Sequence, residues 1–396
     1  MRAIFFTLGI LILIIPEILR VYWIMPFPGS QVDERIAAAY FLYNYIFLFR
    51  IAGILLIISP FYYYMKKRKR IQKIVVLLPV LLYAVIFYLF NYKFLAEKMF
   101  YIPEHKVLLD TSSNKIPTSQ LVIGVEQNGE AKAYPVEIIG YHHQVQDTIG
   151  STPVLITYCT VCRTGRAFSP FIQGKFQHFR LVGMDHFNAM FEDETTKSWW
   201  RQVNGEAVAG PMKGNYLHEI FSQQMTLAEW ISIYPNTRVL QRDSSFLKKY
   251  EGLEKFDEGT IDSDLERRDT GSWQKKSWVV GISIHNSSRA YDWNDLLKLK
   301  LINDTINNIP ILLSLHSDNI SFSAWKSTVG DSVLIFTRND SLGRMQDLQT
   351  NSLWNYSGVC EGGYFKGKQL QPIQAYQEFW HSWKGFHPAT TMFKKQ

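Results

Sequence analysis

Cysteine is scarce in this sequence, and several familiar catalytic signatures are missing from it. Only three of the 396 residues are cysteine, and two of them, Cys159 and Cys162, stand two residues apart. A covalent haem would require a histidine directly after the second cysteine, but Arg163 stands there. The sequence contains no Ser-His-Asp hydrolase motif and no glycine-rich phosphate-binding loop. The segment Tyr158-Cys-Thr-Val-Cys162 is therefore the one place where reactive side chains gather.

Excess charge is also missing from most of the chain. The formal net charge is +7, and six of the positive charges fall within the eight residues from Lys66 to Lys73. The remainder is close to neutral, which argues against a nucleic-acid partner.

The apolar residues are concentrated before about residue 95. Three runs, Ala3–Met25, Ala37–Met65 and Ile74–Tyr92, each reach the roughly 20 residues that a helix needs to cross a bilayer. No small-x-small cleavage site follows the first run, so it is expected to be a retained anchor rather than a signal peptide. The sequence therefore predicts a transmembrane anchor over residues 1–95, with helices at about 3–25, 37–65 and 74–92.

The basic loop between the second and third runs predicts the orientation of this anchor. Short loops rich in Lys and Arg stay in the cytoplasm. This places the N-terminus inside and everything after about Leu95 outside. We expect an integral protein of the inner (cytoplasmic) membrane, with the lipid bilayer as a partner and an extracytoplasmic C-terminal part. Within the membrane, Glu17 and Arg50 are costly to bury singly and are predicted to pair.

The part after the anchor is an internal duplication. Val122–Tyr134 is echoed by Val279–Tyr291, and matched Gly, Pro, Trp and Asp residues continue at an offset of 157 and then 153. We therefore predict a first repeat over 96–243, a charged connection running over the surface at 244–276, and a second repeat over 277–396.

Within each repeat the pattern is mostly one of short strands. Residues 121–126 and 131–135 flank Gln-Asn-Gly-Glu, which is a hairpin signal. A helix is predicted at 227–234, where four large apolar side chains share one face, and again at 376–383. Further elements are expected at 135–140 (one helical turn), 154–158 (a buried strand) and 176–182 (an extended run). The expected fold class is α+β, predominantly antiparallel β, as a tandem duplicated domain after three transmembrane helices.

Comparison of the two copies separates residues that serve the fold from residues free to carry chemistry. Four positions of the first copy, His142, His143, Cys159 and Cys162, correspond to Leu299, Lys300, His316 and Asn319 in the second. The joint loss of both thiols and the histidine pair is typical of a functional site confined to one copy.

The cysteine pair predicts a redox-active dithiol. In an oxidising extracytoplasmic compartment, Cys159 and Cys162 would form a reversible disulfide. Arg163 and Arg166 follow, and nearby cations favour the thiolate. A thioredoxin-type site is disfavoured, because no amphipathic helix follows the pair. The expected activity is thiol–disulfide exchange or redox sensing with an unknown thiol/disulfide protein or small oxidant, with Arg163 assisting ionisation.

Three alternatives stay open from the sequence. Cys159, Cys162, His142 and His143 form a set suited to zinc or copper(I), in a binding module without turnover. The aromatic segment 199–202 lines a ligand groove or, more commonly for such residues, belongs to the core. A third alternative is a purely structural role for the cysteine pair.

The segments Asp147–Cys162 and Asp193–Gly205 closely resemble the domain of unknown function 3179 family. That family's pattern reads Thr-Tyr-Cys-Pro-Leu-Cys followed by Ser-x-Trp-x-Gln-x-x-Gly, and the resemblance covers about residues 105–395. This chain departs from it with Thr160-Val161 in place of Pro-Leu and with Arg163 in place of Gly. The resemblance implies no established reaction. Some members place selenocysteine in the Cys-x-x-Cys, which implies a redox role for this pair.

Overall fold

The computed structural model of the chain describes residues 1–67, 69–339 and 341–394. The chain divides into two compact units. The first comprises Met1–Tyr101 and Phe171–Leu217, and the second comprises Ile102–Pro170 and His218–Gln396. The segment Phe171–Leu217, which belongs to the first repeat in sequence, therefore folds with the anchor.

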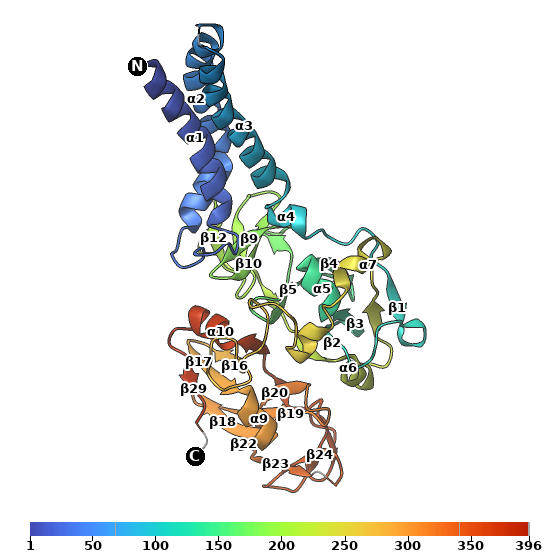
Figure 1. Cartoon of the computed structure of the whole chain (residues 1–396). Helices are drawn as coiled ribbons and strands as arrows, with labels where there is room; N and C mark the ends of the chain where they lie inside the picture. Colours follow the sequence, from blue (N-terminus) through green and yellow to red (C-terminus); the bar gives the residue numbers. More distant parts are fainter. Residues whose placement is uncertain (68, 340, 395–396) are drawn as a thin grey trace. The chain divides into compact units, whose positions relative to one another are not determined.

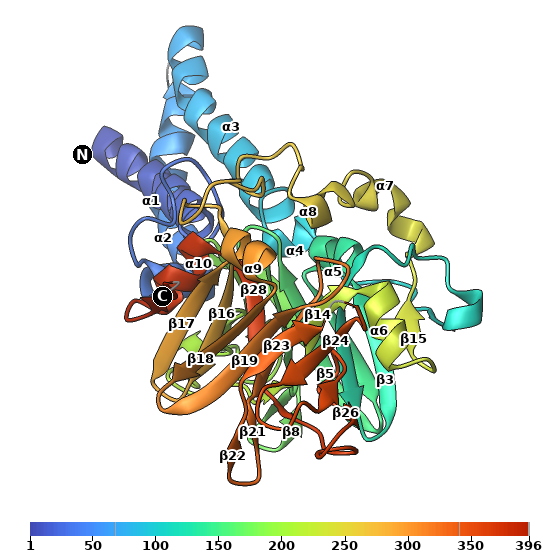
Figure 2. The same ribbon diagram turned by 90° about the horizontal axis from the view of Figure 1, so that it is seen from below.

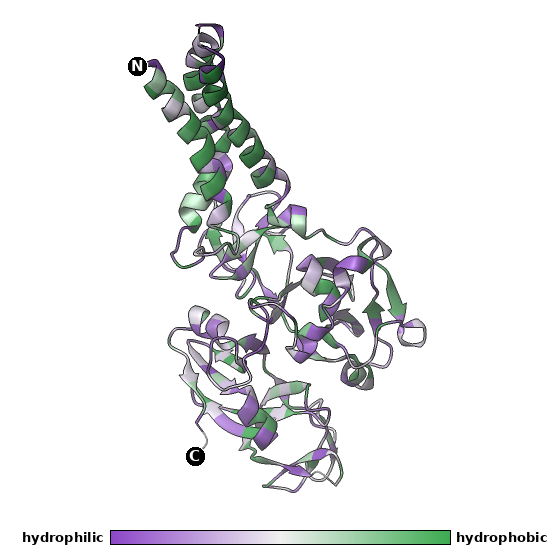
Figure 3. Cartoon of the chain, in the orientation of Figure 1, coloured by the Kyte–Doolittle hydropathy of each residue, from purple (hydrophilic) through white to green (hydrophobic). Residues whose placement is uncertain are grey.

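Three long apolar helices begin the chain, as predicted (Figure 1). They are α1 (Arg2–Tyr22), α2 (Ile36–Lys67) and α3 (Arg70–Tyr92). Each is long and apolar enough to cross a membrane. Figure 3 shows hydrophobic residues along most of their length. These helices are consistent with membrane anchoring.

A cluster of charged side chains joins the three helices. The carboxylate of Glu17, on α1, accepts hydrogen bonds from Arg20 at 3.0 Å and from Nε of Arg50, on α2, at 2.5 Å. Both arginines also donate to Oδ1 of Asn91, on α3, at 2.7 and 2.8 Å. The predicted pairing of Glu17 with Arg50 is confirmed, and it satisfies a carboxylate that is 0% exposed.

The first unit also contains a small antiparallel sheet of order β12-β11-β10-β9. Its strands are β9 (Phe179–Asp185), β10 (Asn188–Asp193), β11 (Trp199–Arg201) and β12 (Ala207–Ala209). The unit is completed by helix α4 (Ala96–Met99) and by the two-stranded sheet of β7 (Phe171–Ile172) and β8 (Lys175–Phe176).

The aromatic segment at 199–202 is core rather than a groove. Trp199 packs its ring edge-on against Tyr40 and Tyr43 of α2, with centroids 5.0 and 5.7 Å apart. Trp200 is also buried, and its indole N–H donates to the carboxylate of Asp193 at 2.9 Å. The sheet is therefore joined to the anchor by packing as well as by the chain.

The second unit contains the rest of the first repeat. Its helices are η1 (Thr111–Ser113), α5 (Val136–His142) and α6 (Leu227–Ile233). Its strands form a sheet of order β1-β15-β3-β2-β14 and another of order β13-β6-β5-β4. The strands are β1 (Leu108–Asp110), β2 (Leu121–Gln127), β3 (Glu130–Pro135), β4 (Gln144–Ile149), β5 (Thr152–Cys159), β6 (Thr164–Phe168), β13 (Glu219–Ile220), β14 (Gln223–Thr226) and β15 (Arg238–Leu240).

The connection after the first repeat packs into this unit. It forms η2 (Ser244–Phe246), α7 (Leu247–Tyr250) and α8 (Lys255–Glu258). Tyr250 and Phe256 are each only 1% exposed. The connection therefore contributes to the interior, although its charged sequence predicted a run over the surface.

The second repeat follows with the same order of elements. Its helices are α9 (Trp293–Leu299) and α10 (Trp380–Phe386). Figure 2 shows the β16–β17 and β18–β19 hairpins next to each other. The sheet orders are β28-β16-β17-β29, β18-β19-β20-β27, β23-β24-β25-β26 and β21-β22. The strands are β16 (Trp278–Ile284), β17 (Ser287–Asp292), β18 (Leu301–Ile306), β19 (Ile309–Leu315), β20 (Phe322–Lys326), β21 (Thr328–Val329), β22 (Ser332–Val333), β23 (Phe336–Asn339), β24 (Arg344–Asp347), β25 (Leu353–Trp354), β26 (Cys360–Gly362), β27 (Gln371–Pro372), β28 (Ala375–Phe379) and β29 (Thr391–Met392).

The two repeats share packing details as well as element order. A Cβ on Gly124 would lie 2.3 Å from the Trp230 ring, and one on Gly281 would lie 2.2 Å from the Trp383 ring. In each repeat, a strand glycine therefore makes room for a helix tryptophan. Most neighbouring strands pair antiparallel, so the predicted α+β class with predominantly antiparallel strands is confirmed.

One predicted helix begins later than expected. Residues 376–379 belong to strand β28, where Phe379 pairs with Trp278 of β16, and helix α10 starts only at Trp380. The apolar spacing at 376–383 spans a strand end and a helix start, which periodicity alone does not distinguish.

Candidate functional site

The cysteine pair lies in the turn that joins strands β5 and β6. Strand β5 ends at Cys159, which faces Thr164 of β6 across the ladder. The backbone N–H of Arg163 donates to the carbonyl of Thr160 at 3.2 Å and closes the turn, with Arg163 in the left-handed region at φ 56°. Cys159 and Cys162 are both 0% exposed. The pair stands at a strand end, as the sequence predicts, but it is wholly enclosed.

Neither cysteine is in a disulfide, and the two thiols interact with each other. Burial raises the pKa of the Cys162 thiol well above its usual value, and the hydrogen-bonded neighbour Cys159 raises it further. The hydroxyl of Ser382 acts in the opposite direction. Cys162 is therefore protonated at neutral pH, and a base must take its proton before it can act as a thiolate.

Lys276, just before the second repeat, brings an amine to the thiols. Its Nζ donates to the carbonyl of Val161, inside the Cys-x-x-Cys, at 2.9 Å, and also to the carbonyl of Leu265 and to Nε2 of His381 at 3.2 Å. Burial lowers the pKa of Lys276 to about 8, although the two thiols act to raise it. Burial and the adjacent amine lower the pKa of His381 to about 3, so this ring stays neutral and can accept. The site thus has an amine that gains or loses a proton near pH 8.

A buried network of charged and polar side chains stands on the other side of Cys162. Glu378 accepts from Nη2 of Arg166 at 2.6 Å, from the Thr164 hydroxyl at 2.9 Å and from the Ser382 hydroxyl at 3.0 Å. The guanidinium carbon of Arg166 lies 3.2 Å from the centroid of the Tyr376 ring. Arg166 and Glu378 are at most 1% exposed. The network fixes the Ser382 hydroxyl beside the thiol.

Arg163 directs its guanidinium toward the connection and the second repeat. Its Nε donates to Oε1 of Gln377 at 2.9 Å, and its terminal nitrogens donate to the carbonyls of Phe256 and Asp257 at 2.8 and 3.2 Å. The guanidinium also stacks 3.7 Å from the centroid of the Trp278 ring. Assistance to thiolate formation by Arg163 stays a prediction, because these contacts are not with the thiols.

The adjacent histidines His142 and His143 have structural contacts. Nε2 of His142 lies 2.6 Å from the hydroxyl of Tyr250. His143 ends helix α5 at φ 62°, and its carbonyl accepts from the backbone N–H of Tyr158 at 3.0 Å. Lys300 ends α9 with the same φ of 62°. Burial lowers the pKa of His143 to about 4. The conformation at this position therefore serves the fold in both copies.

The alternative metal site draws no support from this geometry. Within residues 1–67, 69–339 and 341–394, no three His, Cys, Asp or Glu side chains are grouped to hold a metal ion. The predicted zinc or copper set of Cys159, Cys162, His142 and His143 is thus not brought together.

Sequence comparison of the copies did not identify the residues that complete the site. Lys276, Glu378, His381 and Ser382 all lie outside the first repeat. The sequence of the second copy nevertheless contains a pattern that points to two of these residues. Glu378 and His381 stand 153 residues after Met225 and Ala228, so they are polar where the first copy is apolar, whereas Ser382 corresponds to Glu229, which is also polar. Searching the second copy for what the first lacks would have found Glu378 and His381.

Comparison with known proteins gives one match. A family described as protein of unknown function (DUF3179) matches residues 103–390. No curated protein and no solved structure matches the chain.

Proposed function

The chain belongs to the family of proteins of unknown function (DUF3179), and we propose that it is a membrane-anchored thiol–disulfide redox protein whose Cys159/Cys162 pair cycles between dithiol and disulfide. The observation that carries the proposal is the interaction of two reduced thiols with each other beside the amine of Lys276. Two thiols that interact across one turn are placed to form a disulfide between them.

The proposed reaction transfers two electrons from the cysteine pair to a partner disulfide. A thiolate of the pair attacks one sulfur of the partner disulfide, forms a mixed disulfide and releases one partner thiolate. The second cysteine thiolate then attacks the cysteine sulfur of the mixed disulfide and releases the other. The pair ends as the Cys159–Cys162 disulfide, and the two cysteine protons end on the two partner thiols. The partner is a thiol/disulfide protein or a small disulfide oxidant.

Lys276 and His381 supply the proton handling in this proposal. With a pKa of about 8, the Lys276 amine has a neutral fraction that can accept a thiol proton. The resulting ammonium is held by the carbonyls of Val161 and Leu265 and by the neutral ring of His381. Because both thiols are buried, the turn between β5 and β6 must become accessible to the partner disulfide before a thiolate can attack it.

The proposal includes the side of the membrane on which the pair acts. The basic run that starts at Lys66 favours a cytoplasmic loop between the second and third spans, so the second unit would be extracytoplasmic. An oxidising compartment there would keep the disulfide form accessible. Protease added to intact cells tests this, because protection of the second unit would contradict the orientation.

Thiol counting tests the redox role. The full chain in detergent is treated with a small disulfide oxidant, denatured and alkylated with iodoacetamide. Intact-protein mass spectrometry then counts the alkylated thiols. We expect one reactive thiol after oxidation and three after reduction, with a midpoint potential that is independent of protein concentration.

The third cysteine provides the matched control. Cys360→Ser, like the native residue buried in the second repeat, should leave the two-thiol change intact. Cys159→Ser and Cys162→Ser should each abolish it. Three reactive thiols under all conditions, or stoichiometric zinc or copper that is lost in Cys159→Ser, would contradict the proposal and favour a structural or a metal-binding role.

A further inference from the structure

A second candidate site is a cavity that Arg163, which directly follows Cys162, helps to line. This cavity, of about 570 Å³, is lined by residues of the first repeat, the connection and the second repeat, all within the second unit. Its apolar wall includes Leu121, Trp293 and Leu297. Its volume lies in the range of small-molecule sites, which combine apolar walls with a few fixed polar groups.

Four polar side-chain atoms of residues that line this cavity are buried and have no hydrogen-bond partner. Two are acceptors, Oε1 of Gln120 and Oδ1 of Asp257, and two are donors, Nε of Arg268 and Nε1 of Trp278. Gln120 is 8% exposed and Trp278 is 6% exposed. Buried polar groups in proteins are nearly always paired, so four unpaired ones around one cavity point to a missing partner.

The orientation of these atoms is fixed by the other atoms of the same side chains. The amide nitrogen of Gln120 donates to Glu137 at 2.6 Å, which leaves its oxygen unused. Oδ2 of Asp257 accepts from the backbone N–H of Leu121 at 2.9 Å, which leaves Oδ1. The acceptor half of the site is therefore preorganised.

The donor half of the site is fixed in the same way. Nη2 of Arg268 donates to Asn294 at 2.9 Å, which leaves Nε. Trp278 is held between two guanidiniums, with Arg163 at 3.7 Å and Arg268 at 4.2 Å from its ring centroid. Gly259, at φ 74°, allows this packing, because a Cβ there would lie 2.7 Å from both the Trp278 ring and the Arg268 side chain.

The charges divide along the same lines. Within the described part of the chain, Arg163 and Arg268 have no carboxylate in salt-bridge contact, although Asp257 and Asp292 act on them electrostatically at longer range. The exposed residues Glu254 and Glu258 also line the cavity. The acceptor side has the carboxyl of Asp257 and the amide oxygen of Gln120. A complementary ligand has a negatively charged acceptor at one end and a positively charged donor at the other.

We propose that this cavity binds a free amino acid or a dipeptide. Its carboxylate would accept from Arg268 and Trp278, its protonated amine would donate to Asp257 and Gln120, and its side chain would lie against the apolar wall. This proposal does not rest on the redox role of the cysteines, which are absent from the lining.

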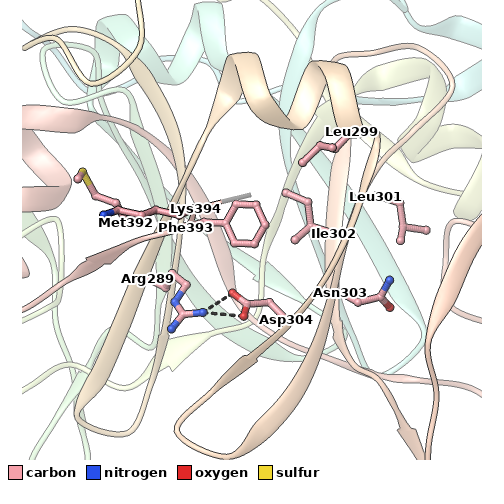
Figure 4. A pocket seen from close by; sticks show the side chains of 9 residues that line it. All are labelled: Arg289, Leu299, Leu301, Ile302, Asn303, Asp304, Met392, Phe393 and Lys394. Carbon is pink, nitrogen blue, oxygen red and sulfur yellow. Dashed lines mark hydrogen bonds and ion pairs between the residues drawn. The ribbon is translucent and has the colours of Figure 1, made fainter. Parts of the chain in front are cut away.

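A second cavity, of about 510 Å³, shows why the polar atoms matter more than the volume. It is lined by residues that include Arg289, Asp304 and Phe393 (Figure 4). There Nη1 of Arg289 donates to both oxygens of Asp304 at 2.6 Å, so the guanidinium and the carboxylate satisfy each other. No lining atom of that cavity is among the unpaired atoms of the described residues. It gives no reason to expect a ligand, and it offers a control arginine.

The test measures binding to the intact chain in detergent at pH 8, where the Asp257 carboxyl, with a pKa of about 7, is mostly ionised. The probes are the twenty free L-amino acids and the dipeptides Ala-Phe and Ala-Leu. Binding is screened by thermal shift and then measured by calorimetry. Each probe that binds is compared with its N-acetyl and its C-amide form. We expect at least one zwitterion to bind and each blocked form to bind at least tenfold more weakly, because one buried charge pair is lost in each case. This comparison uses only the native chain.

Variants then assign the two ends of the ligand. Asp257→Asn and Arg268→Gln should each weaken binding of the zwitterion at least tenfold, whereas Arg289→Gln should leave it unchanged. If no probe binds, or if blocked and zwitterionic forms bind equally, the proposal is overturned. Loss of binding in Arg289→Gln, with its melting temperature unchanged, would also overturn it. Cys159→Ser should bind the probe normally, so a failed redox role and a failed ligand site give different results.

Discussion

Replacing Asp257 with asparagine should stabilise the protein at alkaline pH and have little effect at acid pH. Burial raises the pKa of this carboxyl to about 7, from an ordinary value of 3.8. In the unfolded chain the group ionises near pH 4, whereas in the folded protein it retains its proton up to about pH 7. The folded state is therefore penalised increasingly between pH 4 and pH 7 and constantly above pH 7. The amide of the variant has no such penalty.

The magnitude follows from the change in pKa. A rise of about three in pKa corresponds to about 4 kcal/mol at most, since each unit is about 1.4 kcal/mol. Asp257 lines a cavity rather than a sealed core, so we expect about 2 kcal/mol. For a unit of this size, that is about 4–8 °C in melting temperature.

The assay compares thermal unfolding of the full chain and of Asp257→Asn in detergent at pH 4.5 and pH 8. The variant should match the native chain at pH 4.5 and exceed it at pH 8. The difference in stability between the two proteins cancels the contribution of groups, such as Lys276, that titrate equally in both. A variant that is less stable at pH 8, or a difference that does not depend on pH, would refute the reasoning.

Asp243 provides a control of opposite sign. Its burial acts to raise its pKa, but backbone N–H groups of His105, Ser245 and Glu104 donate to the carboxylate and lower the pKa overall. A depressed pKa stabilises the folded state above about pH 4, and this stabilisation is lost as pH falls. Asp243→Asn should therefore be destabilised at pH 8 and less so at pH 4.5.

Three further predictions concern the thiols and the core. Lys276→Met should remove the rise in the rate of dithiol oxidation that we expect near pH 8, measured by stopped alkylation from pH 6 to 10; an unchanged pH profile would exclude the amine as the base. Gly124→Ala should cost about 1–3 kcal/mol in unfolding free energy, because its Cβ would overlap the Trp230 ring; no loss in denaturant titration would contradict that packing. Glu378→Gln should cost about 3 kcal/mol, because it removes the nearer counter-charge of the buried Arg166 guanidinium and leaves only Glu219, at 3.6 Å; the melting temperature measures this, and a value equal to that of the native chain would contradict it.

Local sequence patterns predicted the elements that depend on local physics. The apolar runs predicted α1, α2 and α3 because bilayer thickness sets their length. The Gln-Asn-Gly-Glu turn predicted the β2–β3 hairpin, in which Asn128 adopts φ 53° and Gly129 φ 81°. The internal repeat predicted the order of elements in both copies.

The composition of the thiol site was not predictable in this way. Glu378 and Cys162 are 216 residues apart in sequence, and no periodicity links them. The site forms because the backbone N–H of Phe379 donates to the carbonyl of Cys162 at 3.0 Å, which brings the second repeat onto the cysteine turn. Arg163 shows the same limitation, because its neighbours in sequence suggested the thiols, whereas tertiary contacts direct it toward Trp278 and Gln377.

The folding of Phe171–Leu217 with the membrane helices has a practical consequence for anyone who wishes to release a soluble fragment. A chain cut near Tyr101 would keep the sheet of β9 to β12 but lose the rings of Tyr40 and Tyr43 that cover Trp199. It would also lose the carbonyl of Ile24, which accepts from the backbone N–H of Met184 at 2.6 Å. The apolar surface of this sheet that becomes exposed would favour aggregation. The boundary between the anchor and the rest of the protein is thus not a single point along the chain, and a fragment intended to be soluble should omit the inserted sheet together with the helices.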